Sequence, residues 1–235
     1  MKKSKFIVLI VINILLIGIV VWLSITNFKN KSANDIYSDN INSIVEVKAT
    51  TEDVGESFGT GVIYDTQGYL LTNAHVISYK TLGENQLFDT FEIRFPLLEE
   101  YQSATFIKVD YELDLAILKI NDESIKYNPI EFSGSDYDFG DIVYAIGNTS
   151  NYGIGISQGI ISVPEVNVKY DDISRLVIQA DINIASGNSG GALLNEKGEL
   201  IGITTFRTKD LLGNVNYGFT YSIPLKVVKE FIKEK

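Results

Sequence analysis

Short segments rich in Val, Ile, Tyr and Phe recur along most of the chain, and they constrain its fold more than any other feature of the sequence. Segments of this composition, bounded by turn residues, are typical of β-strands. A polar stretch at 121–129 separates them into two groups of about six. The sequence therefore predicts an all-β fold of two six-stranded antiparallel β-barrels lying side by side, with a site in the cleft between them. The expected strands lie at 44–49, 59–65, 69–76, 91–95, 104–110 and 114–120 in the first group, and at 142–148, 159–166, 175–182, 192–194, 200–206 and 217–223 in the second.

The C-terminal segment has a different period. Pro224 opens it, and Leu225, Val228 and either Phe231 or Ile232 follow at helical spacing. Proline is favoured in the first turn of a helix, and this spacing gives one apolar face. We therefore expect an amphipathic C-terminal helix that packs on the second barrel.

The N-terminus is strongly apolar. Between Phe6 and Phe28 there is no ionisable side chain, and about 20 such residues suffice to cross a bilayer as a helix. A short basic tail before this run and a long domain after it fit a signal-anchor arrangement. The expected parts are a cytoplasmic tail at 1–5, a transmembrane signal anchor at 6–26, a polar stalk at 27–41 and an extracytoplasmic folded domain at 42–235.

A cleaved signal peptide is the alternative for this N-terminal run. We favour the uncleaved anchor because the run is longer than the roughly 7–15 apolar residues of a signal peptide. Its exit, LSITN at 23–27, also lacks the small-x-small pattern of a cleavage site. The protein is accordingly predicted to be a single-pass protein of the cell membrane.

Charge and composition exclude several classes of function. Without residues 1–31 the chain loses five of its 20 basic residues and none of its 30 acidic ones, which leaves a net charge of −15. Such a domain repels phosphate backbones, so nucleic acid is not an expected partner. The chain has no cysteine and one histidine, so neither disulfides nor a typical zinc site is expected, and we predict no cofactor.

A candidate nucleophile, Ser189, lies in the motif Gly187-Asn188-Ser189-Gly190-Gly191. Glycines beside a serine permit a tight turn that exposes the hydroxyl. The backbone N–H groups of Gly187 and Ser189, with that of Asn188 as a further candidate, can converge on one point as an oxyanion hole. Taken alone, the motif is equally compatible with a glycine-rich hairpin that has no catalytic role.

Two further residues complete a candidate catalytic set. His75 is the only histidine of the chain, and imidazole is the commonest general base. Asp114 begins an apolar strand, where its carboxylate can be buried against the histidine and fix its tautomer. Asp110 and Glu112 are nearby rivals for this orienting role. Each residue taken singly is more often structural, so the argument rests on the set.

Six motifs in order resemble the protease domain of the HtrA (Deg) family within the trypsin-like peptidases, over roughly residues 44–223. The resemblance implies a trypsin-like fold and a serine endopeptidase. It also implies that His75 is the base, that Asp114 orients it and that Ser189 attacks the substrate. The motifs are SFGTGVIYDTQGYLLTNAHVI, DLAILKI, AIGN, SQGIIS, IQADINIASGNSGGALLN and GELIGI.

The chain departs from the family pattern in three ways. No PDZ domain follows the protease segment, so gating of activity by such a domain is not expected within this chain. Ala185 and Ser186 stand where family members usually have an Asn-Pro or Asn-Arg pair. Asn188 stands where digestive trypsin-like enzymes have the aspartate that pairs with a freed N-terminal amine, so activity is expected without N-terminal processing.

Substrate choice is predicted from the position six residues before the nucleophile, which lies at the base of the primary specificity pocket in trypsin-like enzymes. Here it is Asn183, and we expect Ile203, Thr204 and Thr205 to form a wall. A pocket without charge disfavours a substrate Lys or Arg. Small or medium uncharged residues such as Val, Ala, Thr or Ile are therefore expected before the cleaved bond.

The predicted function is hydrolysis of peptide bonds in unfolded or extended extracytoplasmic proteins through the His-Asp-Ser triad. A catalytically silent, membrane-tethered adaptor that keeps the protease fold is the alternative from another class, since fold alone does not guarantee activity. A glutamate-specific protease fits less well, because that group recognises the substrate carboxylate with an additional histidine, and this chain has one histidine.

Overall fold

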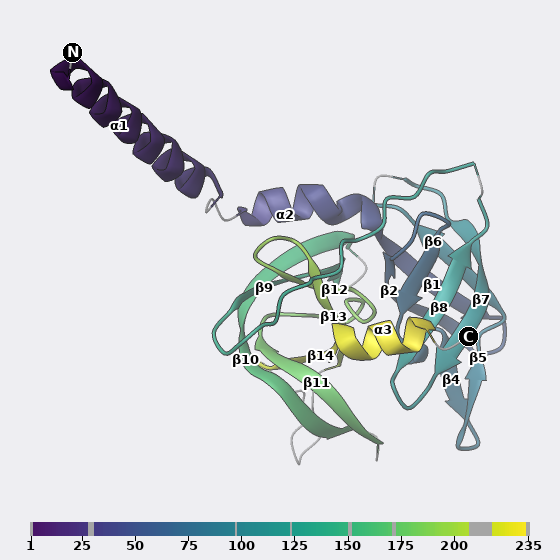
Figure 1. Cartoon of the computed structure of the whole chain (residues 1–235). Helices are drawn as coiled ribbons and strands as arrows, with labels where there is room; N and C mark the ends of the chain where they lie inside the picture. The colour runs from purple at the N-terminus through teal and green to yellow at the C-terminus, as the bar shows by residue number, and fades with distance from the viewer. Residues whose placement is uncertain are drawn as a thin grey trace. The chain divides into compact units, whose positions relative to one another are not determined.

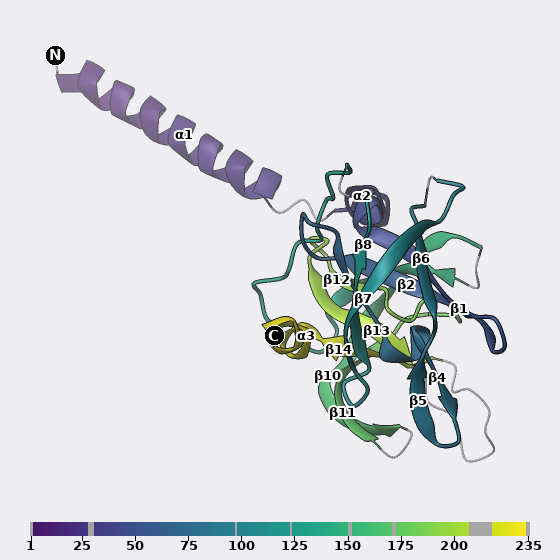
Figure 2. The same ribbon diagram turned by 90° about the vertical axis from the view of Figure 1, so that its right-hand side faces the viewer.

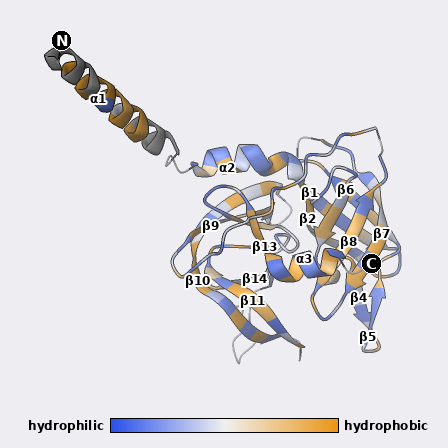
Figure 3. Ribbon diagram, in the orientation of Figure 1, coloured by the Kyte–Doolittle hydropathy of each residue, from blue (hydrophilic) through white to orange (hydrophobic). Residues whose placement is uncertain are grey.

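The chain divides into two compact units, Met1–Lys31 and Ser32–Lys235. The first holds helix α1 (Lys2–Asn27), which is apolar over much of its length (Figure 3). Among the described residues, no helix is both long enough and apolar enough to span a membrane. The transmembrane helix predicted at 6–26 is therefore not confirmed. The computed structural model describes residues 2–27, 31–96, 98–122, 124–149, 152–170, 173–206 and 218–233.

Six strands from the first half of the folded unit close into an antiparallel barrel in the order β1-β2-β3-β8-β7-β6, with β6 pairing back onto β1 (Figures 1 and 2). Val45, Val47 and Ala49 alternate along β1 and are fully buried. They share one core with Leu70 and Leu118 of neighbouring strands. The strands are β1 (Ile44–Thr51), β2 (Gly55–Ile63), β3 (Tyr69–Thr72), β6 (Thr90–Arg94), β7 (Gln102–Asp110) and β8 (Leu115–Ile120).

The second half forms a second closed barrel, in the order β10-β11-β14-β13-β12-β9. Its own core includes Val143, Ala145, Ile161, Ile178 and Leu193. Two closed six-stranded antiparallel barrels confirm the predicted architecture. The strands are β9 (Ile142–Asn148), β10 (Ile154–Tyr170), β11 (Ile173–Asp181), β12 (Ala192–Asn195), β13 (Leu200–Phe206) and β14 (Thr220–Pro224).

A shared apolar core joins the two barrels. It includes Ile44 and Leu71 from the first barrel and Ile146 and Ile203 from the second, all almost completely buried. Because apolar area removed from water stabilises a fold in rough proportion to that area, this interface fixes the barrels against each other. Residues brought from both barrels to their junction are therefore held in one rigid frame.

The predicted C-terminal helix is helix α3 (Leu225–Lys233). Its residues Leu225, Val228 and Phe231 are buried, as their spacing predicted. The Lys108 ammonium group, on strand β7 of the first barrel, donates to the Phe231 carbonyl at 2.9 Å. The helix therefore contacts both barrels rather than the second alone.

A helix, α2 (Ala33–Asn40), lies within the polar stalk predicted at 27–41. It begins with a capping box: the Ser32 hydroxyl accepts the N–H of Asp35, and the Asp35 carboxylate accepts the N–H of Ser32. Capping of this kind satisfies backbone donors that a helix end otherwise leaves free. These local bonds define the start of the helix. The sequence has no long apolar period at this place that would predict it.

Helix α2 belongs to the folded domain. Ile36 is fully buried in the core that the two barrels share, and the Tyr37 hydroxyl donates to the Ile154 carbonyl of β10 at 2.9 Å. One buried isoleucine in so short a segment gives no recognisable period. The compact unit that holds both barrels begins at Ser32 and includes this helix.

A further sheet of two strands, β4 (Ser78–Thr81) and β5 (Glu84–Leu87), was not predicted. Its turn places Leu82 at φ 51° and Gly83 at φ 87°. Two successive residues with positive φ are typical of the type I′ turn of a tight hairpin.

Candidate active site

His75 lies on the short 3₁₀ helix η2 (Ala74–Val76), which follows strand β3. Its neighbours Ala74 and Val76 are buried and anchor this turn against the first barrel. The His75 side chain, by contrast, is 49% exposed. Its ring can therefore meet a molecule arriving from solvent.

Asp114 stands immediately before strand β8 and is only 6% exposed. Its backbone has a φ of 59°, in the left-handed region that aspartate tolerates better than most residues. The preceding loop is held by Asp110, whose carboxylate accepts the N–H groups of Glu112 and Leu113 at 2.8 Å each. Asp110, one rival for the orienting role, thus supports the loop that carries Asp114.

Several hydrogen bonds join His75 to Asp114. The His75 Nδ1 atom lies 3.0 and 2.9 Å from the two carboxylate oxygens, and the His75 backbone N–H donates to the same carboxylate at 3.1 Å. The Thr205 hydroxyl donates to Asp114 as well. Because a carboxylate only accepts, the neutral ring carries its hydrogen on Nδ1 and keeps a lone pair on Nε2. The arrangement suits a base that takes a proton at Nε2.

The charges of this pair shift both pKa values. Burial alone lowers the pKa of His75 and raises that of Asp114. Their mutual attraction and hydrogen bonds more than offset burial, so the pKa of His75 lies above its ordinary 6.5 and that of Asp114 below its ordinary 3.8. Arg175 acts weakly against this rise at His75 through charge repulsion. The ion pair is therefore favoured once the ring is protonated.

The turn before the predicted nucleophile depends on its glycines. The Asn188 N–H donates to the Ala185 carbonyl at 3.2 Å, and Gly187, the third residue of this turn, has a φ of 93°. Both features are typical of a type II turn, which requires glycine at that place. Gly190 has a φ of 84°, and a Cβ atom there would stand 2.1 Å from the Thr60 carbonyl oxygen. Backbone conformation favours glycine at both positions, and the lack of space requires it at Gly190 as well.

The Ser189 hydroxyl donates to the Thr205 carbonyl at 2.9 Å. Within the described part of the chain, no hydrogen bond joins it to His75. Thr205 thus contacts two of the predicted catalytic residues, Ser189 through its carbonyl and Asp114 through its hydroxyl. The structure brings His75 and Asp114 together directly and connects Ser189 to them through Thr205.

Two backbone N–H groups near the serine are available to a ligand. Those of Gly187 and Ser189 have no acceptor among the described residues. The Asn188 carbonyl accepts the Gly191 N–H at 3.0 Å and the Thr204 hydroxyl at 2.5 Å. In a trans peptide the N–H points away from the carbonyl, so the Ser189 N–H faces the opposite side. The N–H of Asn188, the third candidate, is used within the turn.

Of the four residues predicted to line the specificity pocket, only Asn183 is exposed. Ile203 is fully buried in the core between the barrels. Thr204 and Thr205 are also buried, and their hydroxyls are bonded within the site. These three side chains therefore lie in the core or are bonded within the site, and the place of the three residues in a pocket wall stays a prediction. The segment 207–217, which follows them, lies outside the described residues.

Strand β2 also contacts the site, which the sequence did not predict. The Thr60 N–H donates to the Ser189 carbonyl at 2.8 Å. Thr60 stands between two glycines, and a Cβ atom at Gly59 would lie 2.6 Å from Val76 and 3.0 Å from the Ser189 carbonyl oxygen. An isolated glycine in a strand often marks such close backbone approach. The GTG sequence at 59–61 was thus a usable signal.

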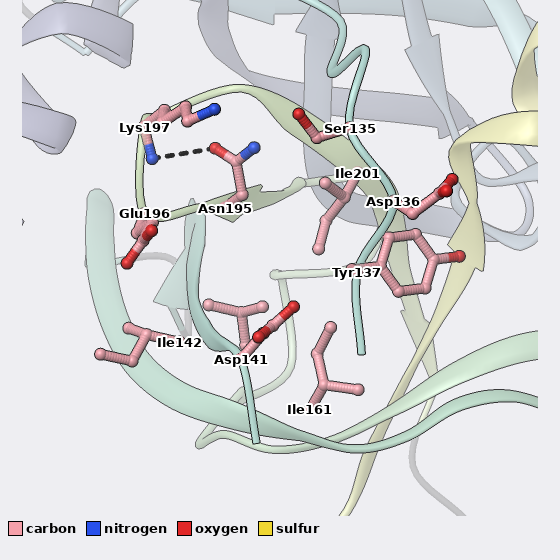
Figure 4. A pocket seen from close by; sticks show the side chains of 11 residues that line it. Ser135, Asp136, Tyr137, Asp141, Ile142, Ile161, Asn195, Glu196, Lys197 and Ile201 are labelled. Atoms are coloured by element: carbon pink, nitrogen blue, oxygen red, sulfur yellow. Dashed lines mark hydrogen bonds between the residues drawn. The ribbon is translucent and has the colours of Figure 1, made fainter. Parts of the chain in front are cut away.

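A pocket of about 150 Å³ lies elsewhere, on the second barrel (Figure 4). None of the predicted site residues lines it. Among the described residues, no group of three or more His, Cys, Asp or Glu side chains is placed to hold a metal ion. The side chains around the pocket belong to Ser135, Asp136, Tyr137, Asp141, Ile142, Val143, Ile161, Asn195, Glu196, Lys197 and Ile201.

Two antiparallel barrels that present a histidine–aspartate pair and a serine in a glycine turn define the class of trypsin-like serine peptidases. Comparison with known families agrees, since the trypsin-like peptidase domain matches residues 59–203. The chain belongs to the trypsin-like peptidase family and is an HtrA/Deg-like member of it.

Relatives and solved structures support this placement. The chain is 35% identical over 184 residues to the serine endoprotease DegS of Haemophilus influenzae. The aligned segment covers 76% of this chain and 50% of the relative. It is 37% identical over 175 residues to a probable periplasmic serine endoprotease DegP-like protein of Buchnera aphidicola, covering 73% of this chain and 35% of the relative. The chain thus spans about half the length, or less, of these curated relatives.

The fold is likewise similar to solved structures. A serine endoprotease from Yersinia pestis has a TM-score of 0.69 at 29% identity, covering 87% of this chain and 66% of that one. The HtrA-type protease AlgW with a tripeptide has a TM-score of 0.71 at 30% identity, covering 86% and 63%. The likeness therefore extends over most of the compact domain.

Proposed function

We propose that the chain is a serine endopeptidase that cleaves peptide bonds through His75, Asp114 and Ser189. The observation that carries the proposal is the His75–Asp114 pair, in which both carboxylate oxygens lie within 3.0 Å of Nδ1 and the ring is half exposed. This geometry leaves Nε2 as the basic atom, which is what activation of a serine hydroxyl requires. The nucleophile is presented from the second barrel by the glycine turn.

The reaction begins when the Ser189 hydroxyl turns from the Thr205 carbonyl toward His75. His75 takes the hydroxyl proton while the oxygen attacks the substrate carbonyl, and Asp114 stabilises the imidazolium. The oxyanion is received by the N–H groups of Gly187 and Ser189. His75 then protonates the leaving amine, and a water molecule, deprotonated by the same ring, hydrolyses the acyl-enzyme.

The proposed substrates are unfolded or extended proteins outside the cytoplasm. Support comes from the relatives, one of which is named as a periplasmic endoprotease. Tethering through the apolar segment at 6–26 is part of the proposal and rests on the sequence alone. The expected preference for Val, Ala, Thr or Ile before the cleaved bond rests on Asn183, which is uncharged.

The proposal is tested by reaction with a fluorescent organophosphonate. We expect the full chain to be labelled at Ser189, because such probes require an activated serine next to an oxyanion hole. Peptide mapping locates the label, and digestion of labelled casein measures turnover. A folded chain that neither reacts nor digests casein is instead the silent adaptor considered above.

The pH dependence of activity follows from the raised pKa of His75. The ring must be neutral to accept the serine proton, and Asp114 raises the pKa of His75 above 6.5. A raised pKa leaves more imidazolium at a given pH, so activity is expected to rise through one ionisation with a midpoint above 6.5. The measurement is kcat/KM between about pH 5 and 9, since this ratio reports ionisation of the free enzyme. A flat profile, or a midpoint below 6.5, contradicts the expectation.

A further inference from the structure

We propose that Thr60 is a positioning residue for the oxyanion hole, acting through its side-chain hydroxyl. The proposal rests on the function proposed above and adds a residue from the first barrel to a turn of the second. Thr60 lies on strand β2 and is fully buried. It does not touch the reacting atoms, so its effect must pass through the backbone that it holds.

The Thr60 hydroxyl makes two short hydrogen bonds to backbone groups of the second barrel. It donates to the Gly187 carbonyl at 2.7 Å and accepts the N–H of Asn148, the last residue of β9, at 2.8 Å. Its single hydrogen is thereby directed at Gly187. The site is tight, because a Cβ atom at Gly147 would lie 3.0 Å from this hydroxyl and 3.1 Å from Asn188.

These bonds fix the peptide between Gly187 and Asn188. Its carbonyl is held by Thr60, and its N–H donates to Ala185. Rotation of this peptide about the chain would break both bonds at once. The Gly187 N–H lies on the preceding peptide, between Ser186 and Gly187, which meets the held peptide at the Gly187 Cα atom. With the peptide after Gly187 held, the φ of 93° at Gly187 sets the direction of this N–H.

The neighbouring peptide, between Asn188 and Ser189, is held separately by Thr204 and Gly191 through the Asn188 carbonyl. The backbone of Thr60 adds a bond on the other side of the nucleophile, from its N–H to the Ser189 carbonyl. The two proposed oxyanion donors are thus supported by different hydroxyls, Thr60 for Gly187 and Thr204 for Ser189. Preorganised donors of this kind avoid reorganisation during the reaction.

The decisive comparison is between Thr60→Val and Thr60→Ser. Valine has nearly the same shape but no hydroxyl, whereas serine keeps the hydroxyl and loses a methyl group. We expect Thr60→Val to lower kcat by about 10- to 100-fold, less than loss of a donor outright, with KM changed little. Thr60→Ser is expected to retain most of wild-type kcat. A buried threonine elsewhere, Thr220, whose hydroxyl donates to the Ala180 carbonyl, supplies the control Thr220→Val.

The experiment uses the full chain and a quenched-fluorescence peptide with Val before the scissile bond, with labelled casein as second substrate. Rates are expressed per site titrated by a fluorescent organophosphonate, so loss of folded protein does not count as loss of catalysis. A peptide boronate of the same sequence, which forms a tetrahedral anionic adduct on the serine, is the second readout. Its inhibition constant should rise in Thr60→Val by the factor by which kcat/KM falls.

A merely structural role predicts fewer titratable sites with unchanged kcat and boronate affinity per site, and this result overturns the proposal. Equal loss in Thr60→Ser and Thr60→Val, or a loss confined to KM, overturns it as well. If Thr60→Val does not fold, the same criteria apply to Thr60→Ala. A wild-type chain that neither reacts with the phosphonate nor digests casein would instead overturn the proposed function, so the two failures are distinguishable.

Discussion

Replacing Ser189 with alanine is expected to abolish peptide cleavage, with kcat lower by about six orders of magnitude. The hydroxyl is the proposed nucleophile, and neither His75 nor the turn glycines can supply another. The fold should persist, because within the described ranges the side chain makes one hydrogen bond, to the Thr205 carbonyl, whose loss costs roughly 1 kcal/mol. Initial rates with labelled casein and the midpoint of thermal unfolding measure the two effects separately.

The matched control is Ser157→Ala, which removes the same hydroxyl from a partly buried position on strand β10, outside the site. It is expected to keep wild-type turnover. More than a trace of wild-type turnover in purified Ser189→Ala, with the control unchanged, would show that another residue carries the attack.

The barrels could be predicted from the sequence because their strands carry apolar side chains on a regular spacing between turn residues. Strand β9 occupies the predicted residues 142–148, and its central residues are buried on both sides. The two barrels were inferred from two groups of about six strands, and both groups close in the structure. Helix α3 was predictable for a related reason, since a helical period and an opening proline coincide there.

Segments whose structure depends on polar contacts could not be predicted in this way. The β4–β5 hairpin is made of mostly polar, exposed residues, so no apolar alternation marks it. Helix α2 depends on one capping box and one buried side chain, Ile36. In both, the determining interactions are a turn conformation or a docking contact, which a hydropathy pattern does not contain.

The candidate site likewise contains residues that could be predicted from the sequence and residues that could not. His75, Asp114 and Ser189 were singled out by motif, and the structure places the first two in direct contact. Thr205 was expected in a pocket wall, but its hydroxyl donates to Asp114. Thr60 was passed over because a threonine in a strand has no chemical signature of its own. The sequence marks reactive groups, whereas the residues that orient them are visible only once distant strands are brought together.

The orienting role of Asp114 can be isolated with Asp110→Asn as the matched control. Asp110 lies four residues earlier, at the end of strand β7, and its Oδ1 atom accepts two backbone N–H groups of the loop that follows. An asparagine amide oxygen accepts the same bonds. Asp110→Asn is therefore expected to keep turnover near the wild-type level. It removes a nearby negative charge but keeps the loop in place, so it shows that loss of a carboxylate alone does not lower turnover.

Asp114→Asn is expected to lower kcat by about four orders of magnitude while the fold remains intact. Asparagine also tolerates the left-handed backbone found at this position, φ 59°. The His75 backbone N–H donates to Oδ1 of Asp114, so an asparagine there keeps its oxygen at that position. Its NH₂ group then takes the place of Oδ2, beside His75 Nδ1 and the Thr205 hydroxyl, which can also accept. Nδ1 must then accept a hydrogen bond, the ring hydrogen moves to Nε2, and the ring faces Ser189 with a donor where a base is required. Steady-state rates of both variants decide the assignment: a large loss in Asp110→Asn with near-normal turnover in Asp114→Asn would move the orienting role to Asp110.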